Sequence, residues 1–516
     1  MDIQQAKEQI KRAVKIYLMK DEFGHYRIPV QEQRPIFLVG APGIGKTAIM
    51  AQIAKELDIS LVPYSMTHHT RQSAIGLPMI VKKEYGGKPY EISEYTMSEI
   101  IASVYEAMEK SGKKEGILFL DEINCVSETL APSMLQFLQY KTFGNHQVPE
   151  GWVIVTAGNP PEYNRSVREF DIVTLDRLKV IVTEPNYGAW RTWALDAQVH
   201  RAVVSYLDIH RDNFYRIENT GKGRTYVTAR GWEDLSQAVK LYEEAGFPVD
   251  EDLISQYIRN EHICADFGSY YRLYHKYGED YHVKDILAGR ASDEVISRAR
   301  EAGFDEKMTL TGLLLDALMP SLHAQVTDED ALRELHTPLA DCGKLAAGAA
   351  EAGMLTARLD SLAADERKGE AADEAGKTAT TSARYVREYK ERFLTALADE
   401  IRKEEIKDAK AAWELIRQEY GVRVRAAGEA AGAVKRSLDN IFDFAAKAFG
   451  KSDQMLVLVT DLSAAPEAAR FISRHGCAGY YEYSRQFMLY ERSRTLRDEI
   501  RQFTDGTAAP DEGMKL

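Results

Sequence analysis

The eight residues GAPGIGKT at positions 40–47 constrain this chain more than any other segment. They match the pattern GxxxxGK[ST], and they stand between a short apolar run and a helical pattern that begins near Thr47. Glycines in such a loop let successive backbone N–H groups turn toward a phosphate, and the N-terminus of the next helix adds partial positive charge. Lys46 is then expected to reach the β- and γ-phosphates of a nucleoside triphosphate, and the Thr47 hydroxyl to ligate Mg²⁺. The residues predicted to hold the nucleotide are Gly40, Ala41, Pro42, Gly43, Ile44, Gly45, Lys46 and Thr47.

Short apolar runs recur along the first part of the chain, and helical patterns separate them. The apolar runs lie at residues 34–39, 60–64, 117–120, 152–156 and 180–183. Helices are expected at 2–20, 47–57 and 97–109, where apolar residues recur at helical spacing. Short buried strands that alternate with helices predict a doubly wound α/β fold with a parallel sheet.

Polar residues follow two of these runs at the point where each strand should end. Asp121 and Glu122 close the run at 117–120, and Asn159 follows the run at 152–156. The carboxyl ends of parallel strands face the ligand crevice in open α/β sheets. Asp121 therefore suits Mg²⁺ coordination, Glu122 suits a general base that polarises an attacking water, and Asn159 can orient that water. The alternatives are that the acids cap a turn and that Asn159 only forms a turn before proline.

These elements together predict hydrolysis of a nucleoside triphosphate with Mg²⁺. Because the sequence contains no N-K-x-D motif for guanine, ATP is the expected nucleotide. A glycine-rich turn beside a structural lysine remains the alternative interpretation of the loop at 40–47.

At this point the chain resembles the MoxR family of AAA+ ATPases, the dynein-related group with an insert in its second helix. The resembling segments are GAPGIGKT at 40–47, LFLDEIN at 118–124, TAGNP at 156–160, LDRL at 175–178 and VTARGW at 227–232. The resemblance extends over about the first 290 residues and implies a P-loop NTPase (AAA+) core with a helical lid.

The resemblance also implies roles for single residues. Asn159 would be the sensor-1 residue, Arg230 the sensor-2 residue that touches the γ-phosphate, and Arg177 the arginine finger that reaches a neighbouring subunit. Arg165 and Arg168 are rival candidates for that contact with the neighbour. Arg177 could instead pair within its own chain, and Arg230 could be an exposed arginine at the start of a helix.

The segment 76–95 falls where this group inserts an extra hairpin and helix. It is rich in lysine, glycine and tyrosine. An exposed hairpin over the pore of a ring would contact a client protein, whereas the alternative is a solvated loop.

Four pieces are expected along the chain. They are an α/β nucleotide-binding core at 1–188, an all-α lid domain at 189–290, a helical extension with an Ala/Glu-rich arm at 291–450, and a strand–helix piece with a flexible tail at 451–516. The lid helices are expected at 189–207, 229–245 and 251–275. The strand of the last piece is expected at 454–460, with helices at 467–475 and from Tyr480 onward. The residues after 290 depart from the family and suggest an accessory docking module.

Composition excludes several other classes of protein. The 516 residues include 66 Lys and Arg against 79 Asp and Glu, and the net charge of −13 argues against nucleic-acid or anionic-membrane binding. No apolar run approaches the roughly 20 residues of a spanning helix, and no secretory signal is visible at the N-terminus. Four widely spaced cysteines fit a reducing cytoplasm, which is the expected location. The adjacent His68 and His69 would point to opposite faces of a strand, which favours a polar contact over a metal site.

By resemblance, the expected function is that of an ATP hydrolase that works as a ring of identical subunits, a hexamer, and remodels or activates a client enzyme. A partner that carries a von Willebrand factor A domain is expected beside the client. Two alternatives stay open: an ATPase motor of a nucleic-acid restriction or defence system, and a scaffold whose assembly is gated by ATP.

Overall fold

The chain folds into two compact units. The computed structural model describes residues 1–67, 74, 76–143, 145–163, 167–220, 223–348, 351–376 and 381–487. The first unit comprises Met1–Trp193 and His210–Cys264, and the second comprises Ala194–Ile209 and the chain from Ala265 onward.

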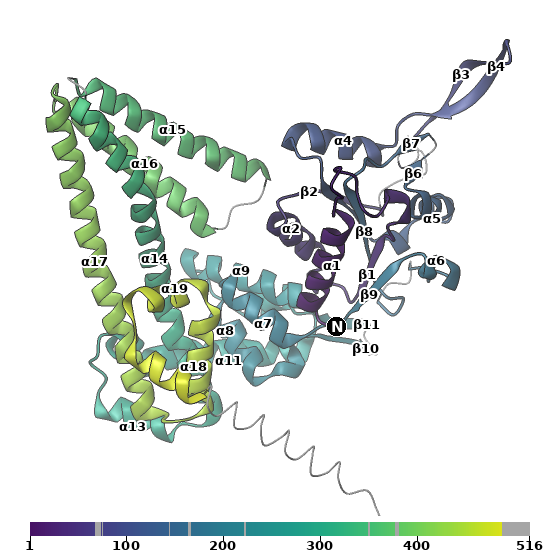
Figure 1. Cartoon of the computed structure of the whole chain (residues 1–516). Coiled ribbons are helices and arrows are strands. Elements are labelled where there is room, and N and C mark those ends of the chain that lie inside the picture. Colours follow the sequence, from purple (N-terminus) through teal and green to yellow (C-terminus); the bar gives the residue numbers. More distant parts are fainter. Residues whose placement is uncertain are drawn as a thin grey trace, which may run out of the picture. The chain divides into compact units, whose positions relative to one another are not determined.

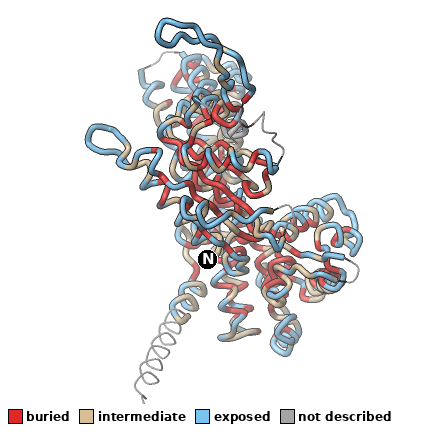
Figure 2. The backbone as a smooth tube through the Cα atoms, turned by 90° about the vertical axis from the view of Figure 1, so that its right-hand side faces the viewer, coloured by how far each residue is buried: buried red, intermediate tan, exposed pale blue. Residues whose placement is uncertain are grey.

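A parallel sheet forms the centre of the first unit (Figure 1). Its strands are β1 (Ile36–Gly40), β2 (Ser60–Ser65), β5 (Gly116–Asp121), β8 (Trp152–Gly158) and β9 (Lys179–Thr183). They lie in the order β2-β5-β8-β1-β9, and each neighbouring pair is parallel. Strands β5 and β8 are buried almost throughout and belong to the red interior of Figure 2. Burial on both faces explains why the strands appear in the sequence as continuous apolar runs, and the predicted α/β fold is confirmed.

Helices cover both faces of this sheet. They are α1 (Ile3–Tyr17), α2 (Lys46–Glu56), α4 (Glu99–Ser111) and α5 (Ala131–Tyr140). On one face, Ile10 of α1 and Ile53 of α2 share a core with Phe119 of β5. On the other face, Ile100 of α4 and Phe137 of α5 share a core with strand residues that include Leu118. Alternate residues of one strand thus face the two helical layers. Packing on both faces fixes the strands, and with them the edge of the sheet at which their carboxyl ends lie.

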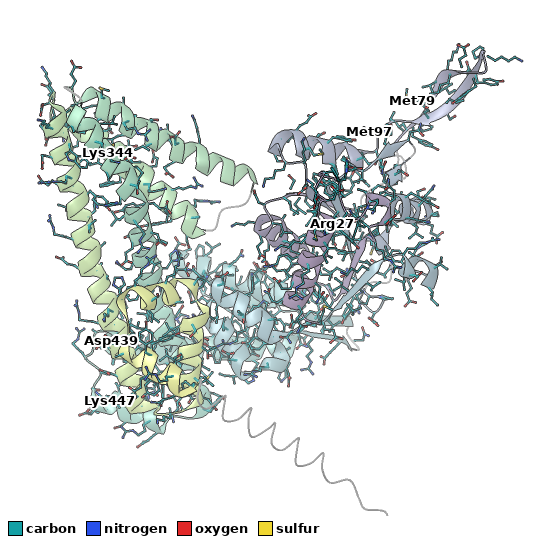
Figure 3. The ribbon with its side chains drawn as sticks, in the orientation of Figure 1. Arg27, Met79, Met97, Lys344, Asp439 and Lys447 are labelled. Carbon is teal, nitrogen blue, oxygen red and sulfur yellow. The ribbon has the colours of Figure 1, made fainter. Side chains whose placement is uncertain are left out.

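A β-hairpin projects from the first unit between β2 and α4 (Figure 1). Its strands β3 (Pro78–Tyr85) and β4 (Lys88–Tyr95) pair antiparallel along their whole length. Met79 on this hairpin and Met97 just after it are labelled in Figure 3, and Ile80 is 73% exposed. This is the hairpin expected in the insert.

The lid region contains a hairpin as well as helices. Strands β10 (Arg216–Thr220) and β11 (Gly223–Val227) pair antiparallel ahead of α9 (Ala229–Ala245) and α10 (Glu251–Tyr257). The sequence analysis expected only helices at 189–290, so this hairpin is a correction. Its signal in the sequence was Gly-Lys-Gly at 221–223, a glycine-rich turn of the kind that joins two strands of a hairpin.

Two of the expected lid helices are each divided. The helix expected at 189–207 is split into α7 (Tyr187–Asp196) and α8 (Arg201–Ile209), and Gln198 between them takes a φ of 55°. A non-glycine residue with positive φ does not continue a right-handed helix. The helix expected at 251–275 is split into α10 and α11 (Glu261–Asp280).

Within the described part of the second unit, every named element is a helix. After α11 come α12 (Val283–Leu287), α13 (Asp293–Glu301), α14 (Phe304–Gly348), α15 (Gly353–Gly376), α16 (Thr381–Lys403), α17 (Ala409–Ala448), α18 (Asp453–Ala464) and α19 (Pro466–His475). Helices α14 to α17 enclose a core of their own, which includes Leu335, Leu355, Leu394 and Ala412. The helical extension is confirmed, and it is a packed bundle rather than a solvated arm. Among the described residues, none of these helices combines the length and apolar character that a bilayer span requires.

The strand expected at 454–460 is wrong, because these residues lie in α18. Met455, Leu458 and Leu462 are buried at helical spacing, whereas Leu456 is partly exposed. The Asp461 carboxylate, also buried, accepts a hydrogen bond from Arg201 at 2.7 Å. The buried residues therefore recur every three to four positions, as on one face of a helix, and not at every second position as in a strand.

The tyrosine-rich segment near the C-terminus packs against the second unit. Residues 478–487 are helical, and the Tyr481 hydroxyl donates to the Ile472 carbonyl at 3.1 Å. Tyr483 stacks on Phe442 with ring centroids 6.3 Å apart. Tyr490 and the tail expected after residue 503 lie outside the described residues.

Candidate nucleotide-binding site

The loop between β1 and α2 has the backbone of an anion-binding turn. Gly43 and Gly45 take φ values of 73° and 91°, which L-residues rarely adopt. Helix α2 begins at Lys46, immediately after Gly45. The free N–H groups of its first turn therefore lie beside the loop, where a phosphate would accept their hydrogen bonds.

Lys46 is the most constrained side chain of the loop. It is 8% exposed. Its ammonium donates to the carbonyls of Gly40 and Ala41 and to Asn159 Oδ1, each at 2.8 Å. All three acceptors are neutral. Burial lowers the pKa of Lys46 to about 8, although the nearby Asp121 and Glu122 oppose that shift. A buried cation with neutral acceptors indicates a place where an anionic ligand would be stabilised.

The residues predicted to hold Mg²⁺ meet at the carboxyl end of β5. The Thr47 hydroxyl donates to Asp121 Oδ2 at 2.8 Å. A hydroxyl and a carboxylate are hard oxygen donors, the class that Mg²⁺ prefers, with water and phosphate oxygens completing its shell. The donor set therefore fits this ion.

Glu122 follows Asp121 in a strained backbone conformation. Its φ of 55° and ψ of 38° lie in the left-handed region, and its N–H donates to Asp121 Oδ1 at 2.9 Å. Such a conformation costs a non-glycine residue about 1–3 kcal/mol and persists where the surroundings fix it, often at functional sites. The turn places a second carboxylate next to the first, close enough to influence Lys46.

Asn159 lies at the end of β8, and a residue that the sequence analysis gave no role holds it there. Asn124, 5% exposed, donates through Nδ2 to the Asn159 carbonyl at 2.8 Å. The Asn124 carbonyl in turn accepts from the Arg168 N–H at 2.9 Å. Through these two hydrogen bonds, Asn124 links the turn after Glu122 to Asn159 and to Arg168. Its only signal in the sequence is its place in the segment LFLDEIN.

The lid region contacts the phosphate loop through backbone atoms. The Arg230 N–H donates to the Gly43 carbonyl at 3.2 Å, and the Tyr215 hydroxyl donates to the Pro42 carbonyl at 3.0 Å. Thr228 caps α9 by accepting from the Gly231 N–H at 3.2 Å. The Arg230 charge also contributes to lowering the pKa of Lys46. Arg230 therefore lies at the phosphate loop, as expected, whereas Tyr215 and Thr228 were not predicted.

An apolar pocket of about 110 Å³ opens beside the same loop. Its lining includes Ile44, Trp190, Trp193 and Phe214. The rings of Trp190 and Phe214 have centroids 5.2 Å apart. Flat aromatic walls beside a phosphate loop suit a purine base. The sequence analysis missed this pocket, although Trp190 and Trp193 are spaced to share a face of α7.

The remaining predicted residues lie apart from this cluster. Arg177 is exposed at the C-terminal cap of α6 (Ile172–Asp176). Hydrogen bonds from Thr174, and then the Arg177 charge, lower the pKa of Asp171 in the same turn. Arg168 pairs with Glu128. Arg165 and the histidines at 68 and 69 lie outside the described residues.

Residues 35–178 match the family model for an AAA domain of the dynein-related subfamily. The matched segment contains the phosphate loop, the two acids after β5 and Asn159. No curated protein matches the chain. Together with the parallel sheet, the match supports an AAA+ ATPase and suggests ATP hydrolysis as its activity.

Proposed function

We propose that the chain is a MoxR-type AAA+ ATPase that hydrolyses ATP with Mg²⁺ and uses the cycle to remodel or activate a client protein. The observation that carries the hydrolase assignment is Lys46, a buried cation with three neutral acceptors. The Thr47–Asp121 pair and Asn159 lie directly beside it.

In phosphoryl transfer, some residues of the site bind the nucleotide and Mg²⁺, and others position the attacking water. Lys46 and the N–H groups of the loop bind the β- and γ-phosphates, and the apolar pocket at Trp190 receives the base. Thr47 and Asp121 hold Mg²⁺, which offsets the charge that develops on the phosphates.

Three further residues act on the attacking water and the γ-phosphate. Glu122 polarises the water as general base, and Asn159 orients it. Arg230 contributes positive charge from the lid of the same chain. Arg177, exposed on α6, suits a contact with the site of a neighbouring subunit. This last role requires a ring of identical subunits, and we propose a hexamer.

The β3–β4 hairpin is the surface proposed to meet the client or a partner with a von Willebrand factor A domain. Exposed apolar side chains gather on and beside it: Leu77, Met79, Ile80, Tyr85, Tyr90 and Tyr95. Met79, Tyr85 and Tyr90 share one face of the hairpin, and Ile80 and Tyr95 lie on the other. Exposed apolar side chains gathered in this way mark a site of protein contact. We place the protein in the cytoplasm.

The test of hydrolysis is Glu122→Gln in the full chain. This variant should bind ATP with unchanged affinity, and its phosphate release should fall by about 100-fold or more, because the general base is lost. Glu106→Gln is the matched control, since Glu106 is exposed on α4 and pairs with Lys110. Phosphate release by Glu122→Gln at the rate of the unmodified chain would contradict the assignment.

The same variant tests the biological role. Expressed in its native host and captured with ATP and Mg²⁺, it should retain the proteins on which the cycle acts. A partner with a von Willebrand factor A domain, together with a client enzyme, would support remodelling. A nuclease or bound nucleic acid would favour a defence motor instead, and capture of the chain alone would favour an ATP-gated scaffold.

A further inference from the structure

An arginine of the lid hairpin forms two hydrogen bonds with the chain just after Asn159. Arg224 lies on β11 and donates through Nη1 to the Tyr163 carbonyl at 3.1 Å and through Nη2 to the Glu162 carbonyl. The two acceptors are consecutive backbone carbonyls. A guanidinium group presents several donors in one rigid plane and can satisfy both at once, which a lysine ammonium does less well.

Residues 162–163, which accept these bonds, are part of a short turn that also has a hydrogen bond of its own. The Tyr163 N–H donates to the Pro160 carbonyl at 3.2 Å. Asn124 holds the start of the same segment through the Asn159 carbonyl at 2.8 Å. Residues 159–163 are therefore held at both ends: Asn159 by Asn124 of the turn after Glu122, and residues 162–163 by Arg224 of the lid hairpin.

The start of α9, just after β11, is bonded to the phosphate loop. Strand β11 ends at Val227, and the N–H of Arg230, the second residue of α9, donates to the Gly43 carbonyl at 3.2 Å. Gly43, Tyr163, Arg224 and Arg230 all line one pocket of about 490 Å³. The segment 224–230 thus borders this pocket, with Arg224 bonded to the segment after Asn159 and Arg230 bonded to the phosphate loop.

We propose that Arg224 is a positioning residue for nucleotide turnover. By tying β11 to residues 159–163, it keeps Asn159 and Arg230 at a fixed separation across the pocket. The inference rests on the proposed function, because it assigns Asn159 and Arg230 to the γ-phosphate. Among the described residues, Arg224 bonds to residues 162–163 and to neither Lys46 nor the phosphate loop, and Lys46 keeps its bonds to the Gly40 and Ala41 carbonyls. Loss of the link should therefore affect the rate of turnover more than nucleotide binding.

The hairpin offers a matched control. Arg216 on β10 pairs with Glu218 Oε1 of its own strand at 2.7 Å. Its substitution removes another exposed arginine from the same hairpin, one that makes no described bond to residues 159–163.

The experiment compares kcat and KM for ATP in full-length Arg224→Ala, Arg224→Lys and Arg216→Ala. We expect kcat of Arg224→Ala to fall about tenfold with KM within about twofold, since two charge-assisted hydrogen bonds are lost. Arg224→Lys should recover part of the rate, because its ammonium can still donate to one of the two carbonyls, and Arg216→Ala should match the unmodified chain. An unchanged kcat in Arg224→Ala, a change in KM alone, or an equal loss in Arg216→Ala would each overturn the proposal.

A second measurement does not depend on catalysis. Amide hydrogen exchange of residues 159–163 should be faster in Arg224→Ala than in the unmodified chain and in Arg216→Ala. Unchanged exchange would overturn the tether. If the unmodified chain itself released no phosphate, the proposed function would fail, while the exchange experiment would still decide whether Arg224 holds this segment.

Discussion

Nucleotide binding should weaken as the pH rises above about 8, because Lys46 then loses its proton in the free protein. Burial lowers the pKa of this ammonium from 10.5 to about 8. A phosphate bound against it would favour the charged form and raise the pKa again. The difference between a pKa of 10.5 and one of about 8 corresponds to about 3 kcal/mol between the charged and the neutral form of Lys46.

The direction follows from proton linkage. Below pH 8, Lys46 is protonated in both the free and the bound state, and affinity should not vary through this group. Above pH 8, binding requires proton uptake, so affinity should fall up to tenfold per pH unit until the pKa of the bound state is reached. At pH 9, about one free molecule in ten retains the proton, and affinity should be about tenfold lower than at pH 7.

The same burial affects stability in the absence of nucleotide. The unfolded chain binds this proton up to its ordinary pKa, so the stability contributed through Lys46 rises as the pH goes from about 8 to 10.5. At pH 7, Lys46→Met removes a buried ammonium whose net electrostatic cost, burial partly offset by Asp121 and Glu122, is about 3 kcal/mol, and it loses three hydrogen bonds of about 1 kcal/mol each. The free energy of unfolding should therefore change by less than about 1 kcal/mol, whereas nucleotide binding should be lost.

The assay is a titration of ATP and Mg²⁺ between pH 7 and 9.5, followed by tryptophan fluorescence, since Trp190 and Trp193 line the base pocket. The Glu122→Gln variant serves as the parent chain to prevent turnover, and phosphate monoesters are fully ionised in this range. Lys113→Met is the matched control, because Lys113 pairs with Asp58 outside the site. A constant affinity from pH 7 to 9.5, or unimpaired binding by Lys46→Met, would refute the reasoning.

Two further substitutions test packing. Arg201→Ala removes the guanidinium that donates to the buried Asp461 carboxylate and should destabilise the second unit by about 3–5 kcal/mol in urea unfolding. A loss below about 1 kcal/mol would contradict the importance of this buried pair. Gly40→Ala would bring a Cβ within 2.9 Å of the Thr183 carbonyl and should cost about 1–3 kcal/mol in thermal unfolding, and an unchanged melting temperature would show that β1 and β9 can separate.

The centre of the site could be predicted from the sequence, because its residues meet at the sheet edge without any detailed knowledge of how the rest of the chain packs. Residues that follow parallel strands gather at one edge of the sheet, whatever the details of packing. Strand β8 lies between β5 and β1, so Asn159, Asp121 and Lys46 meet as the motifs suggested. Each of these positions has a side chain whose chemistry is visible in the sequence.

The periphery of the site could not be predicted in the same way. Tyr215, Arg224 and the Arg230 N–H all bond to backbone carbonyls, at Pro42, at 162–163 and at Gly43. Every residue has a backbone carbonyl that can accept a hydrogen bond, so the type of amino acid does not reveal which carbonyl is used. These donors lie on and beside the β10–β11 hairpin, and the Pro42 carbonyl that accepts from Tyr215 is 173 positions away in the sequence.

The strand wrongly predicted at 454–460, where α18 lies, has a different cause: the prediction rested on too short a segment of sequence. Five consecutive apolar residues carry no period, and two valines among them favour a strand by local propensity. Residues 454–462 do carry a period, because burial recurs at 454–455, 458–459 and 461–462. Asp461 obscures that period, since a carboxylate in an apolar stripe suggests a solvated end. Its partner Arg201 is 260 positions earlier, so only the tertiary structure shows that this charge belongs to the buried face of a helix.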